Sequence, residues 1–340
     1  MGGEKQTDSV DGIELAWARV APKLDTQPLG VTRRIGRINA HLNRNAEEVF
    51  EGFKTTGAGM DVLAGLFAAG PPYQLTPTDL YRGRMMSSAG MTGRLDLVES
   101  SGMVTRSRDP RDRRGVLITL TKSGLRLVRE AGLAVQKRQA FVRRVYTEPE
   151  RKEIMSLLER LLIPHERASS ESPLPTSHAL TEPWTRTFPS ADRWLLAFLV
   201  SIPLLAARIN RESERLVRDH GLTSAGWDII CALRRSSPER LSPGDLSRAA
   251  MMSSAGMTAQ LDQLEKAGLL ERSPHPEDRR GVYVSVTRSG QKLVDQLIEP
   301  YLGVHDRFLT GLSARDRRAL AALLRKLLLS MESARDEAAA

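Results

Sequence analysis

The sequence predicts a mainly α-helical chain with two small β-hairpins, built as two copies of one module. The first observation is a repeat: when 77–128 is aligned with 243–294, about 29 of the 52 positions are identical. The second is that helical hydrophobic periodicity in each copy gives way to two short β-rich runs. The third is a stretch rich in Ser, Pro and Thr between the copies. Two copies in one chain suggest a covalent form of a symmetric dimer.

Length and composition agree with two globular domains. The chain has 340 residues, of which 41% are apolar and 27% charged, as is typical of a soluble protein with two ordinary cores. We place the first module at 11–166, a linker at 167–189 and the second module at 190–333. The two ends, 1–10 and 334–340, are expected to fray.

The charge balance points to a polyanionic partner. A formal net charge of +9, carried largely by Arg, suits phosphates and base edges. The single cysteine, Cys231, excludes an internal disulfide and a cysteine metal cluster, and the six His residues show no metal-ligand spacing. We therefore expect no metal and no cofactor. No uninterrupted apolar run is long enough to span a bilayer, and no signal peptide is visible, so we expect a cytoplasmic protein without a membrane partner.

Each copy contains two short helices joined by a tight turn. Thr76, Pro77 and Asp79 form a helix start with a capping box, and 241–246 repeats that pattern. This first helix runs to about Arg84, and a break follows near Met86-Ser87. The apolar stripe Met91, Leu95, Val98 then predicts a second helix, which Gly102 ends in a left-handed cap. This pattern is typical of a helix-turn-helix motif.

A β-hairpin follows each motif. In the first copy the β-rich runs 103–106 and 116–121 flank a polar, Arg-rich tip at 107–114. Residues 269–287 repeat the hairpin. An Arg-rich hairpin beside a helix-turn-helix is the arrangement called a wing.

Helices surround each winged motif. After the first wing we predict one long helix from Lys122 to about Tyr146, then a last helix opened by the capping box Thr147–Glu150 and ending near Glu166. Upstream, helical stripes occur at 38–53 and 60–66, and an additional early helix at 13–19. Their counterparts in the second copy are 206–220 and 227–233 upstream, a long helix opened by Ser289 and a last helix capped by 313–316.

This order of elements resembles the MarR family of winged helix-turn-helix regulators, over nearly all of both copies. The resemblance rests on Asp112-Arg113-Arg114 with Thr121-x-Ser123-Gly124, on Asp278-Arg279-Arg280 with Thr287-x-Ser289-Gly290, and on Leu222-Thr-x-x-x-Trp227-Asp228. Family members are homodimers that interleave their terminal helices. The resemblance therefore implies two winged modules that form an intramolecular pseudo-dimer through those helices, with the chain acting as a monomer.

The exposed face of the second helix of each motif is the candidate for reading double-stranded DNA. Its small and hydroxylated side chains allow close approach to the major groove and contact with thymine methyl groups. The helix N-terminus favours a phosphate, although Ser88 and Ser254 could instead serve only as helix caps. The candidates are Ser87, Ser88, Ala89, Thr92, Gly93 and Arg94, with Ser253, Ser254, Ala255, Thr258, Ala259 and Gln260 in the second copy.

The wing tips are the second candidate DNA contact. The resemblance implies that Arg114 and Arg280 enter the minor groove and that Asp112 and Asp278 brace the hairpins. The remaining tip arginines would lie near phosphates: Arg108, Arg111, Arg113 and Arg279. The alternative is that the Asp and Arg side chains only pair within the wing.

The near identity of the two motifs predicts a nearly palindromic site. One chain would place its two reading helices about one helical turn apart, roughly 34–36 Å. The differences Gly93/Ala259 and Arg94/Gln260 predict mild asymmetry between the half-sites. Because base-reading groups are few, groove shape should contribute to specificity.

A small aromatic or anionic effector is the second expected partner. Trp17 on the early helix, Asp61 and Asp228 resemble ligand residues of the family's urate-responsive branch. That branch's two ligand-side arginines are absent: Ser107 and Thr119 stand there, with Ser273 and Ser285 in the second copy. The alternatives are ordinary packing for Trp17 and a helix N-terminal charge for both aspartates. Cys231, on an apolar stripe, is expected to be a buried structural thiol.

Three classes of function follow. The sequence favours a sequence-specific DNA-binding transcription regulator, a repressor relieved by a ligand. The alternative is an architectural or weakly specific DNA-binding protein, which would show a steep salt dependence without sequence preference. An enzyme is not expected, because the sequence has no phosphate-binding Gly loop and no nucleophile elbow.

Overall fold

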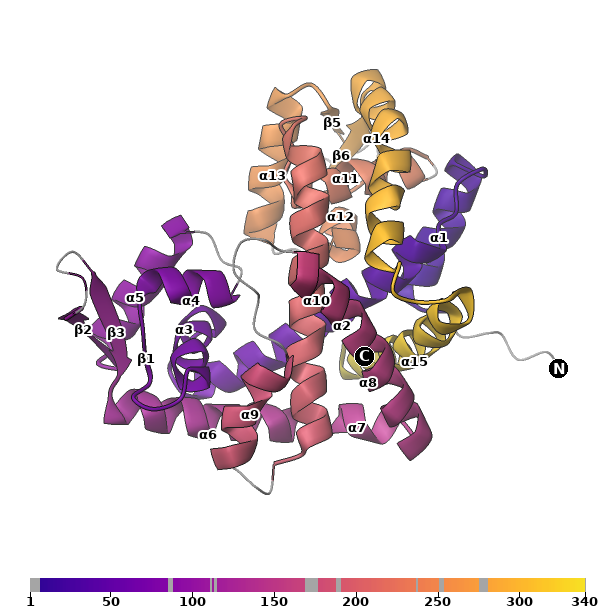
Figure 1. Cartoon of the computed structure of the whole chain (residues 1–340). Coiled ribbons are helices and arrows are strands. Elements are labelled where there is room, and N and C mark those ends of the chain that lie inside the picture. The colour runs from indigo at the N-terminus through magenta and orange to yellow at the C-terminus, as the bar shows by residue number, and fades with distance from the viewer. Residues whose placement is uncertain are drawn as a thin grey trace. The chain divides into compact units, whose positions relative to one another are not determined.

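The computed structural model is mainly helical with two small β-sheets, as predicted (Figure 1). It describes residues 7–84, 88–110, 112, 115–168, 177–187, 191–236, 238–250, 254–274 and 281–339. The chain forms two compact units: unit 1 contains 1–36 and 206–340, and unit 2 contains 37–205. The boundaries fall inside helices α2 (Gln27–Gly52) and α10 (Arg193–Arg218), so unit 1 combines both ends of the chain.

Unit 2 contains one winged helix-turn-helix module. Its sheet is antiparallel in the order β1-β3-β2, and the β2–β3 hairpin forms the wing. Helix α5 occupies the position of the reading helix, beside the hairpin (Figure 1). The elements are α3 (Gly57–Ala68), β1 (Gln74–Leu75), α4 (Pro77–Arg84), α5 (Ser88–Ser100), β2 (Val104–Arg108) and β3 (Val116–Leu120).

Unit 1 contains a second module with the same element order. Its sheet has the order β4-β6-β5, so the topology repeats that of unit 2. The elements are α11 (Ser224–Arg235), β4 (Arg240–Leu241), α12 (Pro243–Ala250), α13 (Ser254–Lys266), β5 (Leu270–Pro274) and β6 (Val282–Val286). The prediction of a mainly helical fold with small β-sheets is confirmed, and the same order of elements occurs in both units.

The predicted capping signals set the ends of the helices. The Asp79 backbone N–H donates to Thr76 Oγ1 at 3.1 Å, and Asp245 and Ser242 repeat this bond at 3.1 Å. At the other end of the reading helices, Gly102 and its counterpart in the second copy, Gly268, have φ of +73° and +69°. Only glycine adopts this left-handed conformation at no steric cost, so each reading helix ends there.

The helix after each wing begins at a threonine cap. Thr121 Oγ1 accepts from the Gly124 N–H at 3.0 Å, and Thr287 accepts from Gly290 at 3.1 Å. A Cβ at Gly124 would lie only 2.1 Å from the carbonyl oxygen of Met103. The Thr-x-x-Gly pattern therefore combines a cap with a close approach of the helix to the wing.

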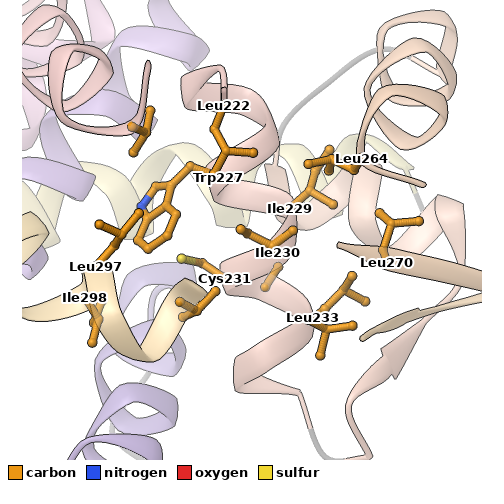
Figure 2. Packing of buried hydrophobic residues seen from close by; sticks show 14 of the residues in the cluster. Leu222, Trp227, Ile229, Ile230, Cys231, Leu233, Leu264, Leu270, Leu297 and Ile298 are labelled. Carbon is orange, nitrogen blue, oxygen red and sulfur yellow. The ribbon is translucent and has the colours of Figure 1, made fainter. Parts of the chain in front are cut away.

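Each module has its own apolar core. In unit 2, Leu95 and Val98 of α5 are buried in a cluster with α3 and the wing; the side chain of Met91 lies outside the described residues. In unit 1, Met257, Leu261 and Leu264 of α13 are buried in a cluster built around α11. Figure 2 shows this second cluster, with Trp227, Ile230 and Cys231 packed against Leu297 and Ile298.

Cys231 is a buried thiol, as predicted. It is 2% exposed, and burial raises the pKa of its thiol above the ordinary value. A thiol in this environment stays protonated and unreactive.

The helix predicted from Lys122 to Tyr146 is interrupted. Helix α6 (Lys122–Arg138) ends at Gln139, and a short helix, α7 (Phe141–Val145), follows. The buried Gln139 side chain donates to the carbonyl oxygen of Leu42 on α2 at 2.8 Å, at the point where the chain breaks. The corresponding α14 (Arg288–Phe308) is continuous. The last helices are α8 (Glu148–Ala168) and α15 (Ala314–Ala339).

Two further helices lie outside the family-like core. Helix α1 (Ser9–Val20) is the predicted early helix. Helix α9 (Ser177–Thr187) lies within the segment predicted to be a linker. The ring of Trp184 on α9 lies 4.6 Å from that of Phe67, and this apolar contact stabilises a helix that local sequence does not indicate.

Helix α10 bears on the expectation that no uninterrupted apolar run is long enough to span a bilayer. Among the described residues it is the one helix long and apolar enough to do so, by length and composition alone. Two polar residues, Ser201 and Arg208, interrupt the apolar run of this helix in the sequence. Both side chains are buried. Five apolar residues recur at helical spacing and are buried as well, a pattern that core helices also show: Leu195, Phe198, Ile202, Leu205 and Ile209.

Candidate nucleic-acid interface

The two reading helices expose the predicted face. Thr92 and Gly93 are exposed on α5, and Thr258 and Ala259 are exposed on α13. Ser88, Ala89, Ser254 and Ala255 lie in the first turns of these helices, and the N-terminal end of a helix attracts anions. Ser87 and Ser253 lie outside the described residues.

The two modules differ at two positions of that face, Gly93/Ala259 and Arg94/Gln260, and the second difference changes a contact. The Arg94 guanidinium lies 3.3 Å from the Asp61 carboxylate on α3. In the second module Gln260 takes the place of Arg94, and its Oε1 accepts from Thr223 Oγ1 at 2.7 Å. Both contacts tie the reading helix to the helix before the motif, one through charge and the other through a neutral hydrogen bond.

The wings carry the remaining predicted contacts. Arg108 is exposed at the end of β2, paired in register with Val116. The Gly115 N–H donates to the Asp112 carbonyl at 2.8 Å and closes the tip of the hairpin. The other predicted tip residues lie outside the described residues: Arg111, Arg113, Arg114, Asp278, Arg279 and Arg280.

Two ion pairs join each wing to its reading helix. Arg106 of β2 contacts Asp96 and, at 3.0 Å, Glu99 of α5. Arg272 of β5 makes the same two contacts with α13, at 2.6 Å to Asp262 and 3.3 Å to Glu265. Surface ion pairs contribute little to stability, so their effect is to orient the hairpin relative to the helix.

The sequence prediction did not include these joining residues, although a signal was present. The arginine and both carboxylates are identical in the two aligned repeats. The contact was not predicted because the arginine lies on a strand and the two carboxylates lie on the preceding helix.

The predicted effector residues lie in two different environments. Trp17 is 2% exposed and belongs to the apolar cluster of unit 1, with the Arg235 guanidinium 5.4 Å from its ring centroid. Asp228 is paired in the same unit with Arg33 of α2, whose Nη1 donates to Asp228 Oδ2 at 2.8 Å. Asp61, in unit 2, contacts Arg94. Trp17 of α1 thus packs against α11, the helix that carries Asp228.

Arg33 also contacts a buried aromatic cluster. Its Nη2 donates to the Tyr301 hydroxyl at 3.0 Å, and burial raises the pKa of that phenol. The His305 ring lies 4.6 Å from the Tyr301 ring, and its Nδ1 lies 2.8 Å from Thr32 Oγ1. Burial, with the nearby Arg33 charge, lowers the pKa of His305 to about 3, so its imidazole is neutral at physiological pH.

Two modules with a helix-turn-helix, a charged wing and an exposed small-residue reading face define a winged helix-turn-helix protein. The model of the MarR family matches residues 222–282. The HTH-type transcriptional repressor NicR of Pseudomonas putida is 34% identical over 116 residues, covering 34% of this chain and 72% of the relative. The chain therefore belongs to the MarR family of transcription regulators.

Other known proteins are similar to this chain. The HTH-type transcriptional regulator PecS of Dickeya dadantii is 28% identical over 152 residues, which is 45% of this chain and 92% of PecS. A solved structure of Bordetella bronchiseptica BpsR, whose DNA binding is regulated by 6-hydroxynicotinic acid, is 30% identical. It covers 35% of this chain and 84% of that one, with a TM-score of 0.32.

Proposed function

We propose that this chain is a sequence-specific repressor that binds a nearly palindromic duplex with its own two winged modules. The observation that carries the proposal is that one chain contains two modules of the same topology with matching exposed reading faces. The comparisons support it, because PecS aligns over 92% of its own length with only 45% of this chain. One chain then corresponds to two such proteins, acts as a monomer, and works in the cytoplasm.

In this proposal the reading helices enter adjacent major grooves and the wings contact the flanking minor grooves. The exposed and first-turn residues of α5 and α13 would contact bases and the first phosphates. Arg114 and Arg280 would reach the minor groove. Arg108, Arg111, Arg113 and Arg279 would lie along the phosphates. The ion pairs of Arg106 and Arg272 support this reading, since they fix the angle between helix and hairpin.

Selection of bound duplexes from a random library tests the proposal. The expected product is a site of two inverted half-sites, with centres about one helical turn apart. Two unrelated half-sites would contradict the palindrome. Binding without sequence preference and with a steep salt slope would favour the alternative, an architectural DNA-binding protein.

A double variant tests the wing contacts. Replacing Arg114 and Arg280 by Ala should weaken binding to the selected site by roughly 30-fold or more, because each inserted arginine contributes about 1–3 kcal/mol. The matched control replaces Arg215 and Arg218, exposed on α10, and removes the same charge. Equal losses in both double variants would show a charge effect without insertion.

We further propose that a small aromatic anion relieves repression by binding near Trp17 and Asp228. Arg33 supports this proposal, because its guanidinium, 24% exposed, lies beside Asp228 in a chain that lacks the branch's two ligand-side arginines. Thermal unfolding with a panel of phenolic and purine anions is the test. A raised Tm with at least one anion is expected, and no shift with any of them would remove ligand control.

A further inference from the structure

The early helix of each repeat packs against the DNA-binding module of the other repeat. Helix α1 precedes the first module in sequence, yet it contacts α11 of the second module. Helix α9 precedes the second module, yet it contacts α3 of the first. Helices α3 and α11 occupy equivalent places in the two modules, so the two contacts correspond.

A tryptophan makes each contact. Trp17 of α1 and Trp184 of α9 occupy aligned positions, each followed two residues later by an arginine. Trp17 is buried in one cluster with Trp227, Ile230 and Cys231 of α11. A repeated tryptophan at the same place in two otherwise different helices points to a shared role.

Trp184 fits closely into the first module. Its ring lies 4.6 Å from Phe67 on α3. A Cβ at Gly132 on α6 would lie only 2.2 Å from the same ring, so the absence of a side chain there makes room for the indole.

Polar contacts hold α1 in place. The buried Arg34 of α2 donates from Nε to Asp8 at 2.7 Å and from Nη2 to Asp11 at 2.5 Å. Arg325 of α15 donates to Asp11 at 2.9 Å, and the Ser9 N–H donates to Glu332 at 3.0 Å. These contacts therefore anchor helix α1 within unit 1.

Each helix that packs against a tryptophan also contacts the reading helix of its own module. In unit 1, Thr223 caps α11 and donates to Gln260 of α13. In unit 2, Asp61 of α3 contacts Arg94 of α5. A shift of α11 or α3 would therefore move the helix that faces the duplex.

We propose that Trp17 and Trp184 are positioning residues that act across the repeats, each holding the DNA-binding module of the other repeat. The effect on DNA rests on the proposed function, whereas the packing claim does not. The consequence is reciprocal dependence: neither repeat can present its reading helix without the early helix of its neighbour.

Hydrogen exchange of the full chain tests the packing claim. Trp17→Ala should raise amide exchange in 224–235 and leave 57–68 unchanged, and Trp184→Ala should do the reverse. Leu15→Ala, on the exposed side of α1, is the matched control and should change neither segment. Faster exchange in 57–68 with Trp17→Ala, equal changes in both segments, or no change would overturn the proposal.

The phenylalanine variants distinguish loss of the tryptophan contact from general unfolding. They also allow the packing claim and the effect on DNA binding to be tested separately. Trp17→Phe and Trp184→Phe keep a ring in place and should restore most of the protection lost in the alanine variants. DNA affinity should fall roughly tenfold with each alanine variant and recover with phenylalanine. Unchanged affinity would overturn the positioning role. If the unmodified chain selects no DNA, the proposed function fails while the exchange pattern still decides the packing claim.

Discussion

The contact between Arg33 and Asp228 shows what a single residue contributes here. The two residues are 195 positions apart, and each side chain is about a quarter exposed, at 24% and 29%. Removing one partner leaves the other charge only partly solvated, which costs more than the pair itself contributes.

We therefore expect Arg33→Met to lower the free energy of unfolding by about 2 kcal/mol, measured by urea denaturation. The matched control is Arg248→Met, which breaks an exposed ion pair with Asp245 on one helix and should cost less than about 0.5 kcal/mol. Equal losses in the two variants would show that burial does not govern the Arg33 contact.

His305 gives unit 1 a pH-dependent stability. Its folded pKa of about 3 lies below the ordinary value of 6.5, so the unfolded chain binds this proton more tightly. The free energy of unfolding should therefore fall as the pH drops below about 6.5, and continue to fall toward about pH 3.

His305→Gln isolates this effect, because the aligned residue in the first repeat is Gln139. Between pH 7 and 5 the unmodified chain should lose about 2 kcal/mol more than the variant. The measurement is urea denaturation at both pH values. The same pH dependence in both proteins would contradict a buried neutral imidazole.

At the scale of single residues, the sequence predicted which positions are exposed better than it predicted which side chains contact one another. The exposed positions Thr92, Thr258 and Ala259 followed from helical periodicity alone. Arg33 and His305 could not be predicted, since their roles arise from contacts between α2, α11 and α14, which are distant in sequence.

At the scale of elements, the close approach of each wing to the next helix is a packing constraint. Gly124 lies against a backbone carbonyl, which cannot move as a flexible side chain would. Gly93, by contrast, has open space around its missing Cβ on the exposed side of α5.

Gly124→Ala should therefore destabilise unit 2 by about 3 kcal/mol, through displacement of the wing from α6. Gly93→Ala, the control, should stabilise the helix by about 0.5–1 kcal/mol, because alanine is the better helix former. Thermal unfolding of the two variants checks both signs. A mild effect of Gly124→Ala would mean that α6 can move away from Met103.

The elements that were predicted well depend on local signals. The capping boxes at Thr76, Ser242, Thr147 and Ser313 all form as expected. The break at Gln139 depends on a carbonyl of another helix, and α9 depends on the packing of Trp184. Local periodicity carries no information about either contact.

At the scale of the whole molecule, the repeat predicted two modules of the same topology, and the structure has them. It did not predict the composition of the compact units. Helix α1 belongs to unit 1 with the second module, and α9 to unit 2 with the first. An apolar stripe shows that a helix is buried, but not which module covers it.

We propose that one chain provides both reading helices for one site. Native mass spectrometry of the full chain with its selected duplex is the most direct test, because it counts chains per duplex. The expected result is one chain on one complete two-half-site duplex, at concentrations near the Kd. Two chains on that duplex as the smallest specific complex would contradict it.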